Sequence, residues 1–435
     1  MKMPKGTDYI LGIQHLFAMF GATVLVPLLT GLDPALALVS AGIGTLLFHF
    51  ITKGKVPVFL GSSFAFIAAI STIVQTMGIP YAQGGIMVAG AIYLVFALIV
   101  YFAGTERIKK LFPPVVTGPV ILVIGVGLGY SAINDASGAS SGLPTGTSWL
   151  IAIAVMILVM LCSVVAKGFF RLVPILIGIA GGYALCLILS LFGIQIIDFS
   201  AIANAHWINI PYVTEGFFSL PKFDLVAILT IAPIAMVTFM EHIGDITTNG
   251  AVVGKDFFKD PGLHRTLIGD GVATIFAGFI GGPANTTYSE NTGVLATTKN
   301  YDPRLLRITA VFAILLGFFG KFGAVLQTIP GPVKGGVEII LFGMISAVGI
   351  RTMAEANLDF TYSRNLMIVA IILVLGVGIT TATYNPATMS VAGIQFTIGG
   401  NVFSLSGLFV ATLAGVLANL ILPRTADQIG KKQEN

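Results

Sequence analysis

The sequence predicts an all-α multi-pass membrane protein, and three observations support this prediction. The 435 residues are 56% hydrophobic and only 10% charged, and the mean hydropathy is +0.95. A soluble domain carries about 25% charged residues, so this chain cannot cover itself with polar surface. Apolar runs of about 20 residues, each long enough to cross the hydrocarbon core of a bilayer, recur from end to end. Most charged residues lie in the short stretches between these runs.

Polar, charged and Gly/Pro-rich stretches divide the chain into fourteen expected membrane crossings. We expect the first apolar run to be a retained span, because no small-residue cleavage site marks it as a signal peptide. The fourteen segments are expected near residues 9–30, 34–52, 57–77, 83–104, 110–130, 148–166, 170–193, 223–246, 266–280, 284–298, 305–326, 332–350, 363–381 and 404–423.

The positions of Lys and Arg agree with this number of crossings. If the N-terminus is cytoplasmic, all 23 Lys and Arg residues except Lys222, Lys321 and Lys334 fall on the cytoplasmic side. The expected outer loops near 131–147 and 382–403 contain no Lys or Arg. Cytoplasmic loops of membrane proteins carry an excess of these residues. We therefore expect both termini in the cytoplasm.

A faint internal repeat divides the expected segments into two sets of seven. PVVTG (114–118) opens the fifth segment and PVKGG (332–336) opens the twelfth. In each, Pro lies near the first helical turn, where its missing N–H costs nothing. Because seven is odd, the second set would cross the membrane in the opposite sense. Transporters with inverted repeats bind substrate near the bilayer midplane, at discontinuous helices.

The third and tenth segments have the composition of discontinuous helices. VPVFLGSSFAFIAAISTIV (56–74) is interrupted by Gly-Ser-Ser, and NTTYSENTG (285–293) precedes a short apolar run. Both favour a short extended stretch followed by a half-helix. Extended backbone at membrane depth is tolerated only where it is buried in protein or lines a cavity. We expect these two segments to face a binding site.

Five acidic residues lie inside expected spans: Glu241, Asp245, Glu290, Glu338 and Asp270. An ionisable group at this depth costs roughly 2.5–3.5 kcal/mol or more unless it is paired or hydrated, so it marks a functional site by default. The first three are interpreted as functional. Glu338 and Asp270 are interpreted as structural carboxylates satisfied by neighbouring groups.

Glu241 and Asp245 are separated by four residues, which places both carboxylates on one helical face. Two like charges so close repel each other, and a proton shared between them relieves the repulsion. This is the chemistry of a proton-coupled carrier. His242 points away from Glu241 and is interpreted as structural. His15, beside Gln14 in the first segment, is a candidate to tether elements of the site.

The sequence offers little to suggest an enzyme. No His, Cys and Glu cluster has the spacing of metal ligands, and no cofactor motif or P-loop is present. Cys162 and Cys186 lie in apolar runs, and we expect them only to pack in the core or face lipid. We expect no metal, no cofactor and no nucleic acid partner, and the net charge of +4 is attributed to orientation in lipid.

Several separated motifs resemble the nucleobase–ascorbate transporter family, and most closely its uracil-transporting bacterial members. The family signature, Gln/Glu/Pro-Asn-x-Gly-x4-Thr-Arg/Lys/Gly, is matched at every fixed position by residues 290–299. The motifs that carry the resemblance are QH (14–15), GSSFAFI (61–67), EHIGD (241–245), NTTYSEN (285–291) and ENTGVLATTK (290–299).

The resemblance implies fourteen segments in two inverted repeats of seven, with two short strands in segments 3 and 10. It implies a core domain (residues 1–104 and 223–330) and a gate domain (residues 105–222 and 331–435), with substrate between them. It also implies import of uracil by proton symport through alternating access, a homodimer, and a place in the bacterial plasma (inner) membrane.

The resemblance also suggests site residues. Glu241 and Glu290 match the carboxylates that contact substrate. Phe64 and Ser289 match strand positions whose backbone N–H groups meet a pyrimidine carbonyl, and Tyr288 lies beside them. Uracil offers two N–H donors and two carbonyl acceptors, so carboxylates and free backbone N–H groups suit its edges.

Polar residues and departures from the family pattern complete the expected site. Gln14, His15 and Asn291 are expected to support the site, and Asp245, Glu241 and Glu290 are expected to carry the coupled proton. Asp245 replaces a His of the uracil branch and is shared with purine-transporting relatives. Phe342 replaces a Tyr of that branch.

Three alternatives to uracil import remain open at the level of the sequence. Asp245 is compatible with a xanthine or other purine permease of the same family. An anion carrier of the same architecture is disfavoured by the acidic site, because a pathway for anions requires Arg, Lys or helix N-termini with free N–H groups. A membrane-embedded enzyme lacks a nucleophile–base pair.

Overall fold

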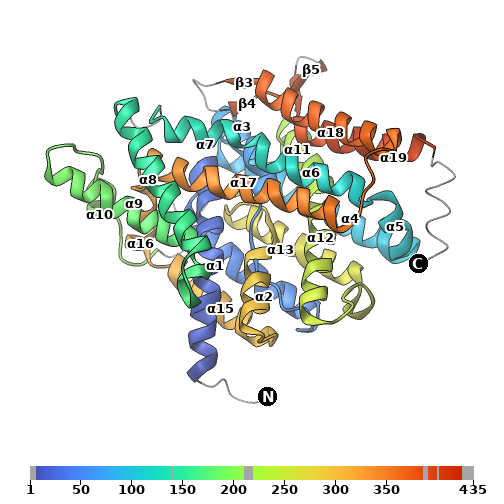
Figure 1. Cartoon of the computed structure of the whole chain (residues 1–435), viewed down its shortest axis with the longest axis horizontal. Coiled ribbons are helices and arrows are strands. Elements are labelled where there is room, and N and C mark those ends of the chain that lie inside the picture. Colours follow the sequence, from blue (N-terminus) through green and yellow to red (C-terminus); the bar gives the residue numbers. More distant parts are fainter. Residues whose placement is uncertain (1–5, 140–141, 210–218, 386–389, 399–400, 424–435) are drawn as a thin grey trace.

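The computed structural model describes residues 6–139, 142–209, 219–385, 390–398 and 401–423, and most of them are helical (Figure 1). The helices are α1 (Gly6–Thr30), α2 (Pro34–Ile51), α3 (Ile67–Thr76), α4 (Ile79–Ala103), α5 (Thr105–Leu111), α6 (Pro114–Gly127), α7 (Gly129–Ala136), α8 (Thr145–Val164), α9 (Pro174–Leu191), α10 (Ser200–Asn204), α11 (Leu225–Ile231), α12 (Ala235–Val253), α13 (Leu263–Ile280), α14 (Ser289–Thr298), α15 (Pro303–Gly317), α16 (Gly320–Gln327), α17 (Gly331–Glu355), α18 (Ser363–Ala382) and α19 (Gly407–Ile421). The strands are β1 (Leu60–Ser62), β2 (Asn285–Thr287), β3 (Tyr384–Asn385), β4 (Ser390–Val391), β5 (Ile394–Ile398) and β6 (Asn401–Leu405).

Nine helical stretches among the described residues are long and apolar enough to cross a membrane. A multi-pass membrane protein is therefore the right class. The other five expected segments contain helices that are shorter or more polar, namely α3, α13, α14, α15 and α19. The count of fourteen crossings stays a prediction.

One group of helices packs around α13. This helix lies against α4 and α2, and α15 packs on α2 and α1. The crossing of α4 and α13 depends on two glycines. A Cβ at Gly90 would lie 2.7 Å from the carbonyl oxygen of Gly271, and a Cβ at Gly271 would lie 2.9 Å from that of Gly90. Small residues let helix backbones approach closely where apolar lipid provides no drive for association.

A second group packs around α17, which lies against α6, α7, α8 and α9, while α18 packs on α19 and α6 (Figure 1). Glycines again allow the closest approach. A Cβ at Gly349 would lie 2.5 Å from the carbonyl oxygen of Gly118, and a Cβ at Gly118 would lie 3.0 Å from that of Gly349. The two groups thus contain segments from both halves of the chain.

The strands β1 and β2 join the two halves of the first group. They are antiparallel, with Leu60 opposite Thr287, Gly61 opposite Thr286 and Ser62 opposite Asn285, and all six residues are buried. Helix α2 satisfies polar groups at this pair, because the Thr45 hydroxyl accepts a hydrogen bond from the Leu60 N–H at 2.9 Å. A helix follows each strand closely. The pair therefore brings two helix starts to one place.

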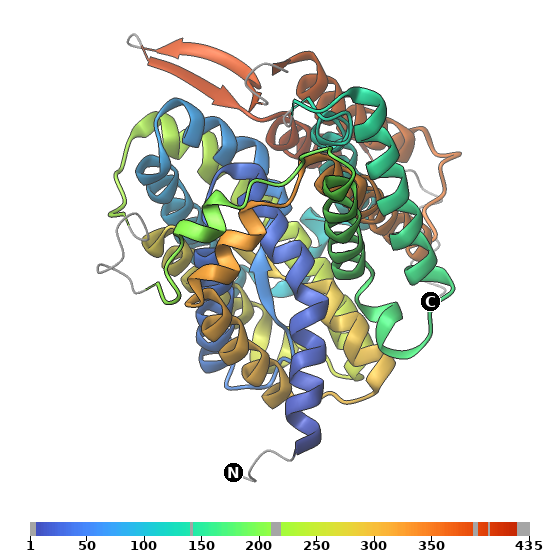
Figure 2. The same cartoon turned by 90° about the vertical axis from the view of Figure 1, so that its left-hand side faces the viewer.

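The segment between α18 and α19 contains strands that the sequence analysis did not anticipate. β5 and β6 form an antiparallel hairpin in which the rings of Phe396 and Phe403 stack with centroids 5.6 Å apart. Figure 2 shows this hairpin extending beyond the helices. β-Branched and aromatic residues favour strands, and cross-strand aromatic pairs stabilise them. The sequence alone predicts only an outer loop near residues 382–403.

Candidate functional site

Three of the predicted acidic residues lie on two helices that pack against each other. Glu241 and Asp245 lie one turn apart on α12, and Glu290 lies in the first turn of α14. Helix α12 packs on both α14 and β2. The strand β2 ends at Thr287, so the strand pair determines where α14 begins. The acidic residues therefore lie beside the break in the tenth segment.

Asp245 is bound to the segment around that break. Its two carboxylate oxygens accept hydrogen bonds from the hydroxyl of Thr287 at 2.9 Å and from the hydroxyl of Ser289 at 2.6 Å. Hydrogen bonds to a charged group are among the stronger ones in proteins. A proton gained or lost at Asp245 would thus alter the contacts that hold β2 and α14 against α12.

Glu241 has spare hydrogen-bonding capacity. Its Oε2 atom is buried and has no hydrogen-bond partner among the described residues. Glu290, also half-buried, lies at the N-terminus of α14, where the helix dipole favours negative charge. A buried carboxylate oxygen without a donor is costly. An N–H group of a ligand would remove that cost at Glu241.

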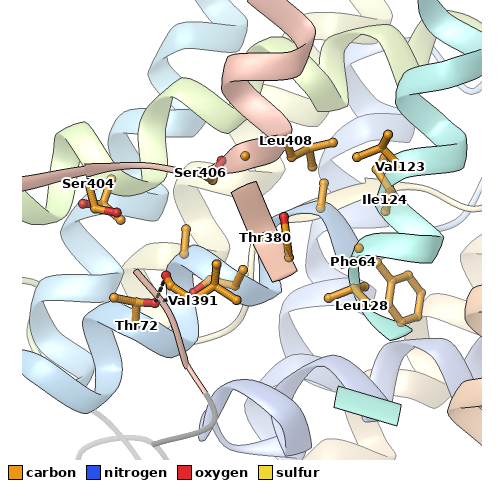
Figure 3. A pocket seen from close by; sticks show the side chains of 16 residues that line it. Phe64, Thr72, Val123, Ile124, Leu128, Thr380, Val391, Ser404, Ser406 and Leu408 are labelled. Carbon is orange, nitrogen blue, oxygen red and sulfur yellow. Dashed lines mark hydrogen bonds between the residues drawn. The ribbon is translucent and has the colours of Figure 1, made fainter. Parts of the chain in front are cut away.

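Phe64 lies at the start of the helix that follows β1 and contacts the second group of helices. Its ring meets the ring of Phe342 on α17 edge to face, with centroids 5.9 Å apart. Phe64 also lines a cavity between α3, α6 and α18, together with Leu128 and Thr380 (Figure 3). The cavity measures about 40 Å³, which is room for a few water molecules only. Phe64 and Phe342 therefore bring the two groups of helices into contact.

The cavity is lined mainly by apolar side chains (Figure 3). None of Glu241, Asp245 and Glu290 lines it. The chemistry of a polar ligand favours the carboxylates over this cavity as the binding site.

Tyr288 holds the strand pair together. It is buried, its hydroxyl donates to the carbonyl of Ser62 at 2.8 Å, and its N–H donates to the carbonyl of Phe59 at 3.0 Å. Its ring lies against Gly61, where a Cβ would overlap the ring atoms. These contacts show a structural role, and a direct contact of Tyr288 with substrate stays a prediction.

The predicted supporting residues link α1 to α14. The side-chain amide of Asn291 donates to the carbonyl of His15 at 3.0 Å and lies 3.2 Å from Nδ1 of the same histidine. His15 and Asn291 are buried, while Gln14 is half-buried. The structure thus brings His15 and Asn291 together from opposite halves of the chain.

The contacts of His242 on α12 and Asp270 on α13 agree with a structural interpretation. His242 lies between Asp270 and Thr266, with Nδ1 2.7 Å from Asp270 Oδ2 and Nε2 2.9 Å from Thr266 Oγ1. His242 and Asp270 are fully buried. The pair joins α12 to α13, and His242 lies three residues before Asp245 on α12. A buried hydrogen-bonded pair of this kind needs both partners, because removing one leaves the other unpaired.

Three polar residues that form hydrogen bonds beside the site, Thr287, Asn249 and Thr292, were not predicted from the sequence. The sequence shows Thr287 only as part of a polar stretch. In the structure, its hydroxyl donates a hydrogen bond to Asp245. Asn249 lies one turn beyond Asp245, and its amide donates to the carbonyl of Pro57 at 3.0 Å and to the hydroxyl of Thr292 at 3.1 Å. The signal for Asn249 was present, since an amide in an apolar helix needs partners.

Exposed polar side chains follow the acidic residues on both helices. Thr247 and Thr248 on α12 and Thr297 on α14 are exposed, whereas the residues around Phe64 are buried. These threonines lie between the acidic residues and the helix ends near Lys255 and Lys299. Among the described residues, no group of three or more His, Cys, Asp or Glu side chains is arranged to hold a metal ion.

Known proteins resemble this chain over nearly its whole length. The sequence profile of the Permease family, which comprises xanthine and uracil permeases, matches residues 6–384. The uracil permease of Bacillus subtilis strain 168 is 42% identical over 421 residues, covering 96% of this chain and 92% of the relative. The uracil permease of Bacillus caldolyticus is 42% identical over 414 residues, covering 95% and 91%.

The fold also resembles a solved transporter. The transmembrane domain of the cyanobacterial bicarbonate transporter BicA superposes with a TM-score of 0.64 at 15% identity, covering 87% of this chain and 96% of that domain. At this identity the likeness concerns the fold alone. The family match over residues 6–384 and the 42% identity with the two uracil permeases confirm the expectation drawn from the motifs: the chain belongs to the permease family of nucleobase–ascorbate transporters.

Proposed function

We propose that this chain imports uracil across the bacterial plasma membrane by proton symport. The observation that carries the proposal is the position of Glu241 and Glu290 beside the paired strands β1 and β2, with an unpartnered carboxylate oxygen at Glu241. The relatives named uracil permease support uracil as the substrate. Because the family consists of permeases, transport and not catalysis is the proposed activity.

Recognition of uracil would use both of its polar edges. The carboxylates of Glu241 and Glu290 would accept hydrogen bonds from the two ring N–H groups. The backbone N–H groups at Phe64 and Ser289, where a helix follows each strand, would donate to the carbonyl oxygens. The first N–H groups of a helix lack partners within the helix, which leaves them available to a ligand. Analogues without these edges would leave buried polar groups unpaired.

The proposed cycle moves a core domain (residues 1–104 and 223–330) against a gate domain (residues 105–222 and 331–435). The packing around α13 and the separate packing around α17 support this division. We propose fourteen crossings in two inverted repeats, both termini in the cytoplasm and a homodimer. The exposed threonines near the acidic residues support a conformation open to the cytoplasm.

The coupled proton would bind within the acidic group of Glu241, Asp245 and Glu290. Uptake of a proton from outside neutralises one carboxyl and lowers the cost of moving the loaded core past the gate. Release inside restores the charge. Asp245 is our first candidate for this role, because its two hydroxyl partners on β2 and α14 would respond to its charge.

Uptake of labelled uracil into proteoliposomes with an imposed pH gradient tests the proposal. We expect uptake when the outside is acidic, with little uptake when the gradient is collapsed by a protonophore. The variant Glu290→Ala should lose uptake under both conditions. Uptake that ignores the gradient and persists in Glu290→Ala would refute the scheme.

A xanthine or other purine permease is the second candidate, and Asp245 is the observation that favours it. Competition of uracil uptake by xanthine and uric acid separates the two, because a purine carrier would bind these bases in preference to uracil. An anion carrier is the third candidate. The shared fold with a bicarbonate transporter does not favour it, since three acidic residues at the site would repel an anion.

A further inference from the structure

A second group of ionisable side chains lies outside the candidate site. Lys334 and Glu338 are four residues apart on α17, and Asp135 lies on α7, which packs against α17. We call these three residues the gate triad. Lys334 was one of the basic residues that did not fit the charge pattern of the loops. Its partner explains the exception, because Nζ of Lys334 lies 3.3 Å from Oδ2 of Asp135.

The charges of the gate triad do not balance if every member is ionised. Lys334 and Asp135 neutralise each other, and the Asp135 side chain is fully buried. Glu338 is also fully buried, and neither of its carboxylate oxygens has a hydrogen-bond partner among the described residues. An ionised carboxylate in this position would be a buried charge without a partner, which is among the costliest arrangements in a protein.

No further cation faces Glu338 from the helices packed on α17. Helix α7 contributes Asp135 and Tyr130, and Tyr384 after α18 lies with its ring 4.2 Å from that of Tyr130. Helices α6, α8 and α9 contain no acidic or basic residue. Their other titratable side chains are Cys162, Tyr183 and Cys186. Only a proton can therefore neutralise Glu338 while Asp135 keeps Lys334.

We propose that Glu338 is a proton-binding site of the gate, protonated while it is buried beside the Lys334–Asp135 pair. When the gate moves and water reaches Glu338, the carboxylic acid releases its proton to water and becomes a carboxylate. This step forms no other bond and needs no other reactant.

The position of Glu338 connects it to the contact between Phe64 and Phe342. Phe342 lies one turn further along α17, and its ring packs on Phe64. A movement that separates Phe64 from Phe342 shifts the turn of α17 that carries Glu338. The role in transport rests on the proposed function, whereas protonation of Glu338 in the structure described here does not.

Infrared spectroscopy of the purified full-length carrier in lipid tests the protonation directly. A protonated carboxyl group has a carbonyl stretching band that a carboxylate lacks. At neutral pH we expect the spectrum of Glu338→Gln to lack one such band present in the wild type. The control Glu355→Gln changes an exposed glutamate paired with Arg351 and should lose no band. A wild-type spectrum without the Glu338 band would overturn the proposal.

The variant Asp135→Asn supplies an independent test should Glu338→Gln fail to fold. It frees Lys334, which then attracts Glu338 one helical turn away, and Glu338 becomes ionised. We expect the same carbonyl band to disappear, although the glutamate is still present. Persistence of that band in Asp135→Asn would contradict the charge argument.

Transport assays separate this inference from the proposed function. We expect Glu338→Gln to keep uracil exchange at equal pH and to shift the pH at which gradient-driven uptake is half-maximal. If the pH profile is unchanged although the infrared band is lost, the release of the proton is refuted. The protonation of buried Glu338 would still stand. If wild-type uptake ignores the gradient, proton symport fails while the infrared result stands.

Discussion

The two glutamates and one aspartate at the candidate site differ in their hydrogen bonding and therefore suit different roles. Glu241 has a buried oxygen without a hydrogen-bond partner among the described residues, Glu290 lies at a helix N-terminus, and Asp245 already accepts hydrogen bonds from two hydroxyl groups. The first two are therefore better placed to bind a ligand. Asp245 is better placed to couple its protonation to the contacts that hold the strand pair.

Replacement of Glu290 by Gln should weaken uracil binding. The amide keeps the size of the side chain and removes the charge from the hydrogen bond. A hydrogen bond to a charged group contributes about 1.5–3 kcal/mol, so we expect the dissociation constant to rise about 10- to 100-fold. Calorimetric titration of the purified protein measures it, and Glu355→Gln is the matched control at an exposed glutamate. Unchanged affinity in Glu290→Gln would remove this residue from the binding site.

Asp245→Asn should affect proton coupling more than binding. The amide can retain a hydrogen bond with Thr287 or Ser289 but cannot take up a proton. We expect uracil uptake to lose most of its dependence on the pH gradient, with a smaller loss of equilibrium affinity. The two are measured by proteoliposome uptake and by calorimetry. Equal loss of both would make Asp245 a binding or structural residue.

At the scale of elements, the strand pair and the helix caps decide the local geometry. β1 and β2 are only three residues long each, and buried side chains on both sides hold them in register. Helix α15 begins with Asp302, whose side chain accepts from the Arg304 N–H at 2.9 Å and from Arg304 Nε at 2.8 Å. Such caps satisfy N–H groups that the helix itself leaves free.

Gly61→Ala should destabilise the site through β1. The new methyl group would overlap the Tyr288 ring and lie 2.8 Å from the Thr23 hydroxyl. Overpacking of this kind costs about 1–3 kcal/mol. We expect a lower melting temperature together with weaker uracil binding, measured by thermal unfolding with and without uracil. Gly127→Ala has open space around the new methyl group and is the control. Wild-type stability of Gly61→Ala would show that Tyr288 does not hold β1.

Asp302→Asn should reduce stability in a pH-dependent way. The hydrogen bonds from Arg304 hold the pKa of Asp302 below its usual range. A lowered folded-state pKa contributes stability that is present above the pKa of the unfolded chain and is lost as pH falls through the folded pKa. The melting temperatures of wild type and Asp302→Asn should therefore differ at pH 7 and converge on acidification. A constant difference across this range would contradict the assignment.

At the scale of the whole molecule, the two helix groups carry different parts of the proposed function. The group around α13 holds the strand pair and the acidic residues, and the group around α17 contributes Phe342 and the gate triad. The contact between Phe64 and Phe342 joins the two groups.

Cysteine labelling should show the orientation and the open side. In a background without Cys162 and Cys186, Thr248→Cys should react with an impermeant maleimide only from the cytoplasmic side. Thr145→Cys at the exposed start of α8 should react only from outside. Labelling of both positions from the same side would refute the proposed topology. Protection of Thr248→Cys by uracil would further support an opening to the cytoplasm.

The sequence by itself determined the membrane class, the family and the positions of the acidic residues along the chain. Each follows from local information: hydropathy over about 20 residues, a ten-residue signature, and the four-residue spacing of Glu241 and Asp245. It also showed where the third and tenth segments break, because Gly, Ser and Asn stand out in an apolar run.

Only the tertiary structure decided which polar groups meet. Asp245 finds its hydroxyl partners 42 and 44 residues away, and Asn291 reaches His15 across 276 residues. Lys334 was an exception to the charge pattern until Asp135 was placed beside it. Such pairings depend on how helices pack against one another, and hydropathy and spacing carry no information about packing partners so far apart in the chain.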